Sequence, residues 1–221
     1  MIFAKKNSYM KIFLALCLSL LTSQTFAQDA KAQGILDKLS TKMKSMKSFY
    51  IEFNASVKNN TTGTNENEFG KGWVKGNKFY ASYGDNAMIC NGVKTWTIIK
   101  EDRSVYESDA SEDDEESINP KRLMTIWETG FKNKYDHEGN FNGKPVHIIN
   151  LYPKVPSKAE YHTIQLYISK TENELVKAIM KTKDGTTMTY SVTKFTANPT
   201  IDDSKFVFDR KKYPGYPVIK D

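Results

Sequence analysis

The sequence predicts a mainly β protein, built from one antiparallel sheet of about ten or eleven strands and two amphipathic helices. After residue 48, apolar and polar side chains alternate in many short segments, the period of half-buried strands. Turn signals such as Asn91-Gly92, Asn142-Gly143 and Asp184-Gly185 separate these segments. Apolar residues recur at three- and four-residue spacings in two stretches only. A sheet this long curls strongly unless it splits or closes, so helices on its concave side would leave room for a cavity.

The first 27 residues have the order of a secretory signal peptide. Lys5, Lys6 and Lys11 precede a short apolar run over residues 12–21, and Thr25-Phe26-Ala27 allows cleavage before Gln28. The sequence therefore predicts a signal peptide over 1–27, an exported domain over 28–221 and a periplasmic location. An uncleaved anchor is the alternative, but the run is short for a bilayer. A lipoprotein signal at Cys17 fits less well because apolar residues continue past it.

Charge and cysteine content exclude several classes of function. The full chain carries a formal charge of +6, and losing the three signal lysines leaves +3 without an Arg- or Lys-rich stripe. This pattern gives no support for nucleic-acid binding. Removing the signal leaves Cys90 alone, so no intrachain disulfide is possible. Its place between Ile89 and Asn91 favours a small buried core residue over a nucleophile.

The mature chain begins with an amphipathic helix. Asp29 can cap it, and it extends to about Lys47, with apolar residues on one stripe and lysines on much of the rest. We expect the helix to cover a sheet, the alternative being a helix on a membrane surface. A first strand from Ser48 follows. Further strands are predicted over 68–75, 78–83, 87–90, 94–99 and 104–107.

An acidic loop and a second helix interrupt the strands. Residues 107–116 predict a solvated loop, with a calcium site as the alternative, although the glycine and spacing of an EF-type loop are missing. Asn119 and Pro120 then predict a short helix through Trp127, closed by Gly130. Strands resume over 131–137, 145–152, 161–169, 174–182 and 186–195. In the proline-rich tail, Phe206 and Phe208 alternate as in a short edge strand.

No catalytic motif stands out. There is no nucleophile elbow, zinc-protease pair, paired-cysteine motif or phosphate loop. His147 and His162 could face each other from neighbouring strands, but no third ligand follows at a metal-site spacing, so we predict no metal. Carboxylates are plentiful, so a glycosidase-like pair stays open. Composition alone leaves a plain packed core as good an interpretation as a ligand cavity.

Several motifs, in order, resemble the LolA family of outer-membrane lipoprotein carriers over nearly the whole mature chain. They are the helix running into 47–53, Gly70-Lys71-Gly72-Trp73-Val74-Lys75 with Lys78-Phe79, residues 91–96, the helix from Asn119, and 203–208 before Tyr213-Pro214-Gly215.

The resemblance implies an unclosed β half-barrel covered by helices, with an apolar cavity for acyl chains and no enzymatic activity or cofactor. Phe53, Trp73, Phe79 and Trp96 would line the cavity from the sheet, and Leu123, Met124 and Trp127 from a lid helix. The implied partners are lipoproteins, an inner-membrane ABC transporter and an outer-membrane acceptor or the outer membrane itself. The protein would act as a monomer. The strand face pointing inward could slip by one residue.

One position departs from the family pattern. An Arg often follows the Val-Lys pair that corresponds to Val74-Lys75 and holds the lid closed, whereas this chain has Gly76. Lid control must then differ, with Lys75, Lys78 and Arg122 as alternatives, and the sequence assigns no single lock residue. The rival functions are a related half-barrel that senses lipids or regulates envelope stress, and a secreted hydrolase.

Overall fold

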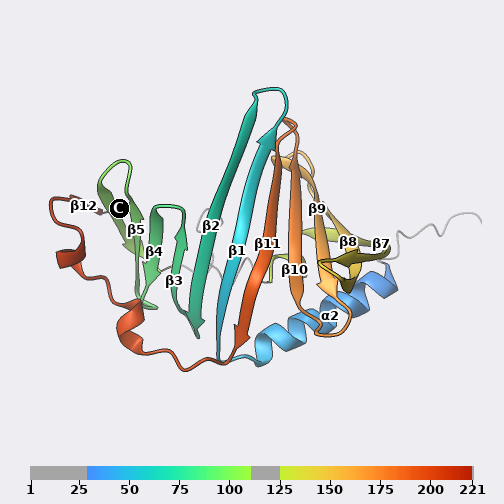
Figure 1. The fold of residues 1–221 in the computed structure, drawn as a ribbon, viewed down its shortest axis with the longest axis horizontal. Helices are drawn as coiled ribbons and strands as arrows, with labels where there is room; N and C mark the ends of the chain where they lie inside the picture. Colours follow the sequence, from blue (N-terminus) through green and yellow to red (C-terminus); the bar gives the residue numbers. More distant parts are fainter. Residues whose placement is uncertain (1–28, 111–124, 221) are drawn as a thin grey trace, which may run out of the picture.

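The computed structural model describes residues 29–110 and 125–220. They form one unclosed sheet of twelve strands with one α-helix, α2 (Figure 1). The helix α2 spans Ala30–Ser45. The strands are β1 Ser48–Asn59, β2 Thr64–Lys75, β3 Lys78–Tyr83, β4 Asn86–Cys90, β5 Lys94–Ile99, β6 Ser104–Asp109, β7 Phe131–Phe141, β8 Lys144–Pro153, β9 Tyr161–Ser169, β10 Leu175–Thr182, β11 Thr187–Ala197 and β12 Val218–Lys220.

The strand order is β12-β6-β5-β4-β3-β2-β1-β11-β10-β9-β8-β7. Neighbours are antiparallel except β12, which pairs in parallel with β6. The long strands β1 and β11 therefore join two meanders, β2–β6 on one side and β7–β10 on the other. The prediction of a single antiparallel sheet is confirmed, with slightly more strands than expected.

The predicted N-terminal helix is confirmed. The Asp29 side chain accepts hydrogen bonds from the backbone N–H groups of Lys31 and Ala32, at 3.0 and 3.1 Å, and so caps α2. The other carboxylate oxygen of Asp29 accepts the Tyr135 N–H of β7 at 2.9 Å. These bonds hold the pKa of Asp29 below its usual value. One side chain thus starts the helix and attaches it to the sheet. Figure 1 shows α2 along the lower ends of β7–β10.

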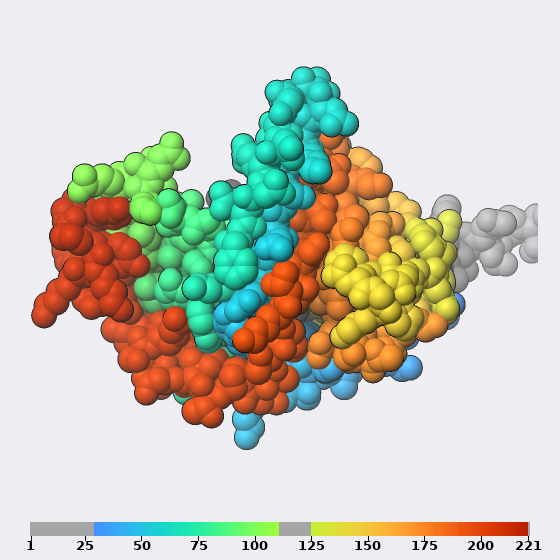
Figure 2. Space-filling view, viewed as in Figure 1, coloured from blue at the N-terminus to red at the C-terminus, as the bar shows by residue number. Residues whose placement is uncertain are grey.

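The C-terminal tail differs from its prediction. Instead of an edge strand at Phe206 and Phe208, residues Asp203–Phe206 form the short 3₁₀ turn η2, a second turn η3 spans Arg210–Lys212, and the edge strand is β12. Phe206 is buried and Phe208 stacks on Trp96, with ring centroids 5.4 Å apart. Both aromatic rings therefore anchor residues 199–220 to the sheet, and we call this segment the C-terminal strap. In Figure 2 this strap, in red, lies beside and over the green strands β3–β6.

Candidate functional site

The sheet has two faces with different coverings. Directly paired residues share a face, so the register carries Phe49 of β1 to Val74, Phe79 and Cys90 on the successive strands β2–β4. These residues belong to the core that includes α2, and we call their side the inner face. The outer face carries Ile89, Ile98 and Val105, which pack with the C-terminal strap.

The four sheet residues predicted to line a cavity do not share one face. Phe53 and Phe79 lie on the inner face. Trp73 pairs with Tyr50 and Tyr80 on the outer face, and Trp96 stacks there on Phe208. In β2 the inner positions are Gly70, Gly72 and Val74, so the conspicuous Trp73 points away from the helix.

Under α2 the inner face is filled. The apolar stripe of α2, Ala32, Leu36, Leu39 and Met43, is buried. Its core cluster includes β8 and β9 side chains that are almost fully inaccessible: Ile149, Leu151, Leu166 and Ile168. Burying a side chain such as Leu39 contributes about 1.5–3 kcal/mol. This part of the sheet is a packed core, and a binding surface has to lie beyond the helix.

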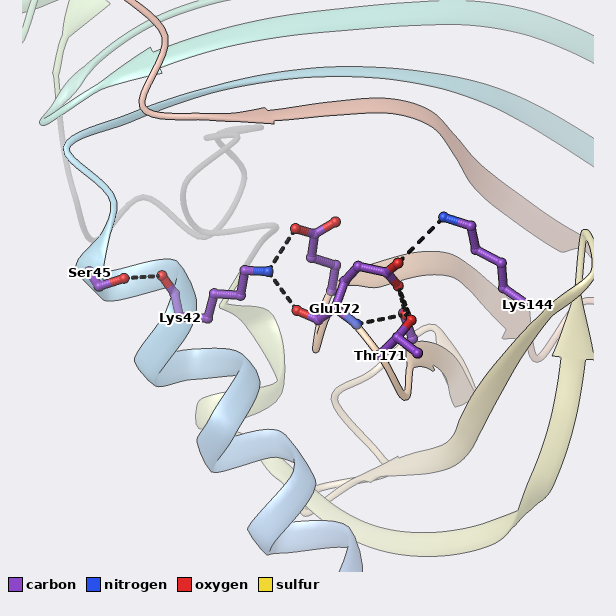
Figure 3. Close-up of polar contacts among 7 residues, drawn as sticks. Lys42, Ser45, Lys144, Thr171 and Glu172 are labelled. Atoms are coloured by element: carbon purple, nitrogen blue, oxygen red, sulfur yellow. Dashed lines mark hydrogen bonds and ion pairs between the residues drawn. The ribbon is translucent and has the colours of Figure 1, made fainter.

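A polar network holds the C-terminal half of α2 against the β9–β10 turn (Figure 3). The Lys42 ammonium donates to the Glu172 carbonyl oxygen at 2.5 Å and forms an ion pair with Glu174 at 2.8 Å. The Glu172 carboxylate accepts hydrogen bonds from Ser169 and Thr171, which lower its pKa to about 2. The turn therefore presents a fixed acceptor to α2, while Lys144 lies 3.6 Å from the Glu172 carboxylate on the far side.

Beyond α2, the inner face presents apolar side chains that are only partly covered. Tyr83 and Tyr190 retain 38% and 37% of their surface. The other apolar side chains grouped with them are half-buried. We call this set the open inner surface; it consists of Phe53, Val57, Ala81, Tyr83, Met88, Ala178, Met180, Met188, Tyr190 and Val192. Three methionines make it adaptable, because unbranched thioethers repack easily.

Phe53 lies at the centre of the open inner surface. Its ring stacks on Tyr83 at 6.5 Å and meets Tyr190 edge-on at 6.1 Å. The ring lies directly over Gly70, where an added Cβ would come within 2.1 Å of Phe53 Cζ. Only glycine lets the aromatic ring lie flat on β2 at this point. A shift in the β1–β11 register between Glu52 and Phe53 adds a bulge beside it.

The charges at one border of this surface are negative. Glu68 and Glu66 continue the inner face of β2 past Gly70. The pKa of Tyr83 is raised by burial first and then by the charges of Glu68 and Glu66. The tyrosine is therefore a neutral hydrogen-bonding group at ordinary pH.

Of the predicted lid, Leu123 and Met124 lie outside the described residues, as do Arg122, the signal peptide and the acidic stretch 111–116. Trp127 lies in η1, a 3₁₀ turn over Ile126–Glu128, and is buried. Its Nε1–H donates to Ser40 Oγ of α2 at 2.8 Å. Trp127 thus belongs to the core around α2.

Lys75 and Lys78 hold the C-terminal strap. Their ammonium groups lie 2.8 and 3.2 Å from the two carboxylate oxygens of Asp203, and Lys75 also donates to the Ile201 carbonyl. These bonds lower the pKa of Asp203. Both lysines, which are two of the alternatives for lid control, therefore bind η2. Gly76 adopts a positive φ of 60° in the β2–β3 turn.

Cys90 is buried, as expected. His147 pairs with Ile168 in the β8–β9 register, so it does not face His162. Within 29–110 and 125–220, no group of three His, Cys, Asp or Glu side chains is placed to hold a metal ion. In the same ranges no helix is long and apolar enough to cross a bilayer.

The sequence model of the outer membrane lipoprotein carrier protein LolA matches residues 44–209. The chain belongs to the LolA family. The match runs from the end of α2 through η2, so it includes every strand of the open inner surface. No curated protein gives a significant match.

Two solved structures share the fold of this chain. An uncharacterized conserved protein from Thermus thermophilus superposes with a TM-score of 0.54 at 13% identity, covering 86% of this chain and 99% of that one. LprF from Mycobacterium bovis gives a TM-score of 0.50 at 13% identity, with 79% and 97% covered. At these identities the likeness concerns the fold alone.

The sequence did not identify Tyr83, Tyr190, Met180 and Met188 as site residues. The strand pairing contains the missing information, because residues paired across neighbouring strands point to the same side of the sheet. Once Phe53 is placed inward, the β1–β11 register brings Tyr190 inward opposite Ala55. That register depends on the bulge at Glu52/Phe53, which the alternation in β1 does not reveal.

Proposed function

We propose that this LolA family member is a periplasmic carrier that shields the acyl chains of lipoproteins on the open inner surface and moves them from the inner to the outer membrane. In this proposal, residues 1–27 direct export and 28–221 form the carrier. An inner-membrane ABC transporter supplies the cargo, and an outer-membrane acceptor or the membrane itself receives it.

The observation that carries the proposal is the partly exposed apolar surface on the same face as α2. Tyr83 and Tyr190, which both contact the central Phe53, are more than one third exposed, and the methionines of this surface are half-buried. Sheltering an acyl chain from water is worth about 0.8 kcal/mol per CH₂ group, so a carrier needs apolar area rather than catalytic groups. A surface of adaptable side chains also favours release, because it is not tightly complementary to one ligand.

The test is a release assay. Membranes carrying a radiolabelled lipoprotein are incubated with the transporter, ATP and the mature protein, and label is measured in the soluble fraction. Tyr83→Asp introduces a charge on the open inner surface and should abolish release. Phe69→Asp is the matched control, because Phe69 is 47% exposed and lies on the outer face of β2, opposite Asn54. It should release label as the wild type does.

Two outcomes would contradict the proposal. If the wild type brings no labelled lipoprotein into solution, the chain is not a carrier, and co-purifying lipid would then favour the lipid-sensing alternative. If Tyr83→Asp and Phe69→Asp release equal amounts of label, cargo does not bind to the open inner surface.

A further inference from the structure

A pocket on the outer face, on the opposite side of the sheet from the open inner surface, has a composition of its own. It has a volume of about 370 Å³ and lies between the β1, β2 and β11 strands and the start of the C-terminal strap. Its lining consists of Tyr50, Trp73, Thr196, Pro199, Thr200, Ile201, Asp202, Ser204 and Lys205. The carrier proposal makes no use of any of these side chains.

Aromatic rings form one wall of this outer pocket. The Tyr50 and Trp73 centroids lie 4.6 Å apart, and Tyr80 meets Trp73 edge-on at 5.5 Å. The Tyr50 hydroxyl donates to Glu52, which fixes the ring. This wall offers a flat apolar surface, so a ligand with a ring or a short apolar part can lie against it.

Three lysine ammonium groups surround the same rings. Lys205 Nζ lies 3.7 Å from the Trp73 ring and 4.5 Å from Tyr80. Lys71 lies 5.7 Å from Trp73, and Lys194 lies 5.7 Å from Tyr50. Within the ranges that the structure describes, no acidic side chain comes within ion-pair distance of any of the three.

Two carboxylates lie near the pocket and keep their negative charge, because the groups that donate to them are neutral. Glu52 accepts the Tyr50 hydroxyl, and Asp202 accepts the Ser204 N–H at 2.8 Å as the cap of η2. Burial lowers the pKa of Lys205, and repulsion from Lys71 and Lys212 lowers it further. Three lysines therefore lie around the aromatic wall against two carboxylates, Glu52 and Asp202, which leaves one positive charge in excess.

We propose that the outer pocket binds a small organic phosphate, with the phosphate at the Lys205 ammonium and a flat or apolar part on Tyr50 and Trp73. A phosphate monoester carries up to two negative charges, which matches lysines from three separate segments, and lysine binds phosphate as a point charge. Thr196 and Thr200 supply hydroxyl groups on the lining. A soluble phosphate ester and a phospholipid headgroup both present a phosphate anion, although the headgroup phosphate is a diester with a single negative charge.

Calorimetric titration of the mature protein with phenyl phosphate and with inorganic phosphate tests the soluble source. Co-sedimentation with vesicles of phosphatidylglycerol, against vesicles of phosphatidylcholine, tests the headgroup. Phenyl phosphate should bind more tightly than inorganic phosphate because of the aromatic wall. Lys205→Gln should weaken binding at least about tenfold, the usual effect of losing a charged hydrogen bond.

Lys58→Gln is the matched control. It also removes one positive charge, but Lys58 is exposed and lies eight residues along β1 from Tyr50, roughly 26 Å away. It should leave binding unchanged. If Lys205→Gln does not fold, Lys71→Gln at the rim of the pocket replaces it. We expect this second variant to weaken binding severalfold.

Binding of phenyl phosphate that depends on Lys205 supports a soluble ligand. Binding to phosphatidylglycerol vesicles alone, with the same dependence, supports the headgroup. The proposal is overturned if Lys205→Gln and Lys58→Gln lose the same amount of binding affinity. It is also overturned if the wild type binds neither phenyl phosphate nor phosphatidylglycerol vesicles. Because the pocket and the open inner surface lie on opposite faces, lipoprotein release by the wild type is expected whichever result is obtained.

Discussion

The contact between Phe53 and Gly70 gives the most direct test of the open inner surface. A Cβ at position 70 would lie 2.1 Å from Phe53 Cζ and 2.5 and 2.7 Å from two further ring carbons. In Gly70→Ala the ring must retreat by about 1.3 Å to restore an ordinary 3.4 Å contact. It would then lose part of its contacts with Tyr83 and Tyr190, each worth about 0.5–1.5 kcal/mol.

The expected net effect is a loss of about 1–3 kcal/mol in the free energy of unfolding, the usual range for overpacking. Removing a strand glycine contributes about 0.5–1 kcal/mol in the opposite direction. Urea denaturation followed by circular dichroism measures the difference. Gly72→Ala is the control on the same strand and face, because its nearest contact would be Ile51 Cγ2 at 3.4 Å. That variant should be neutral or slightly stabilised.

A double-mutant cycle completes the test. Phe53→Ala removes the ring that blocks position 70, so adding Gly70→Ala to it should cost nothing further, and the two losses should not add. If Gly70→Ala is no less stable than Gly72→Ala, or if the cycle is additive, the ring does not lie over Gly70 and the described surface is wrong.

Three further results are expected. Lys42→Met should destabilise the protein by about 1 kcal/mol and increase amide exchange in α2, because the ammonium bonds to Glu172 and Glu174 are lost; unchanged exchange would show that the network does not hold the helix. Leu39→Ala should cost about 2–5 kcal/mol in urea denaturation, since Leu39 is fully buried; a loss below about 1 kcal/mol would contradict the packed core. Burial, and then Lys170, lower the pKa of His147 below 6.5, so the unfolded chain binds the proton more readily and stability should fall as pH drops through 6.5; His147→Gln should flatten that dependence, and an identical pH profile would refute it.

Features with a local cause could be predicted closely. The bounds of β3, β5 and β9 agree with the alternation in the sequence, and Asp29 caps α2 as its side chain suggests. Asn142, Gly143 and Gly185 adopt positive φ in two of the predicted turns. In each case the residues that decide the conformation lie within a few positions of one another, so the sequence contains the whole argument.

The candidate site was predicted only in part, because bulky residues occur on both faces of β2–β5. Alternation separates Trp73 from Val74 but does not say which of them points to the helix. The strap that covers the outer face comes from residues more than 100 positions later, where Phe208 meets Trp96. Large aromatic residues in the sequence therefore do not distinguish the inner core from the second core on the outer face.

The sequence by itself determined the succession of one capped helix and a long antiparallel meander, together with the family resemblance that implies acyl-chain cargo. Those features depend on side-chain period, turn residues and capping, which act over short distances. Only the tertiary structure decided that α2 packs solidly on β8 and β9, that the open inner surface centres on Phe53, and that Trp73 and Lys205 meet in an outer pocket. Each depends on strand register and on contacts between distant segments, which local patterns do not specify.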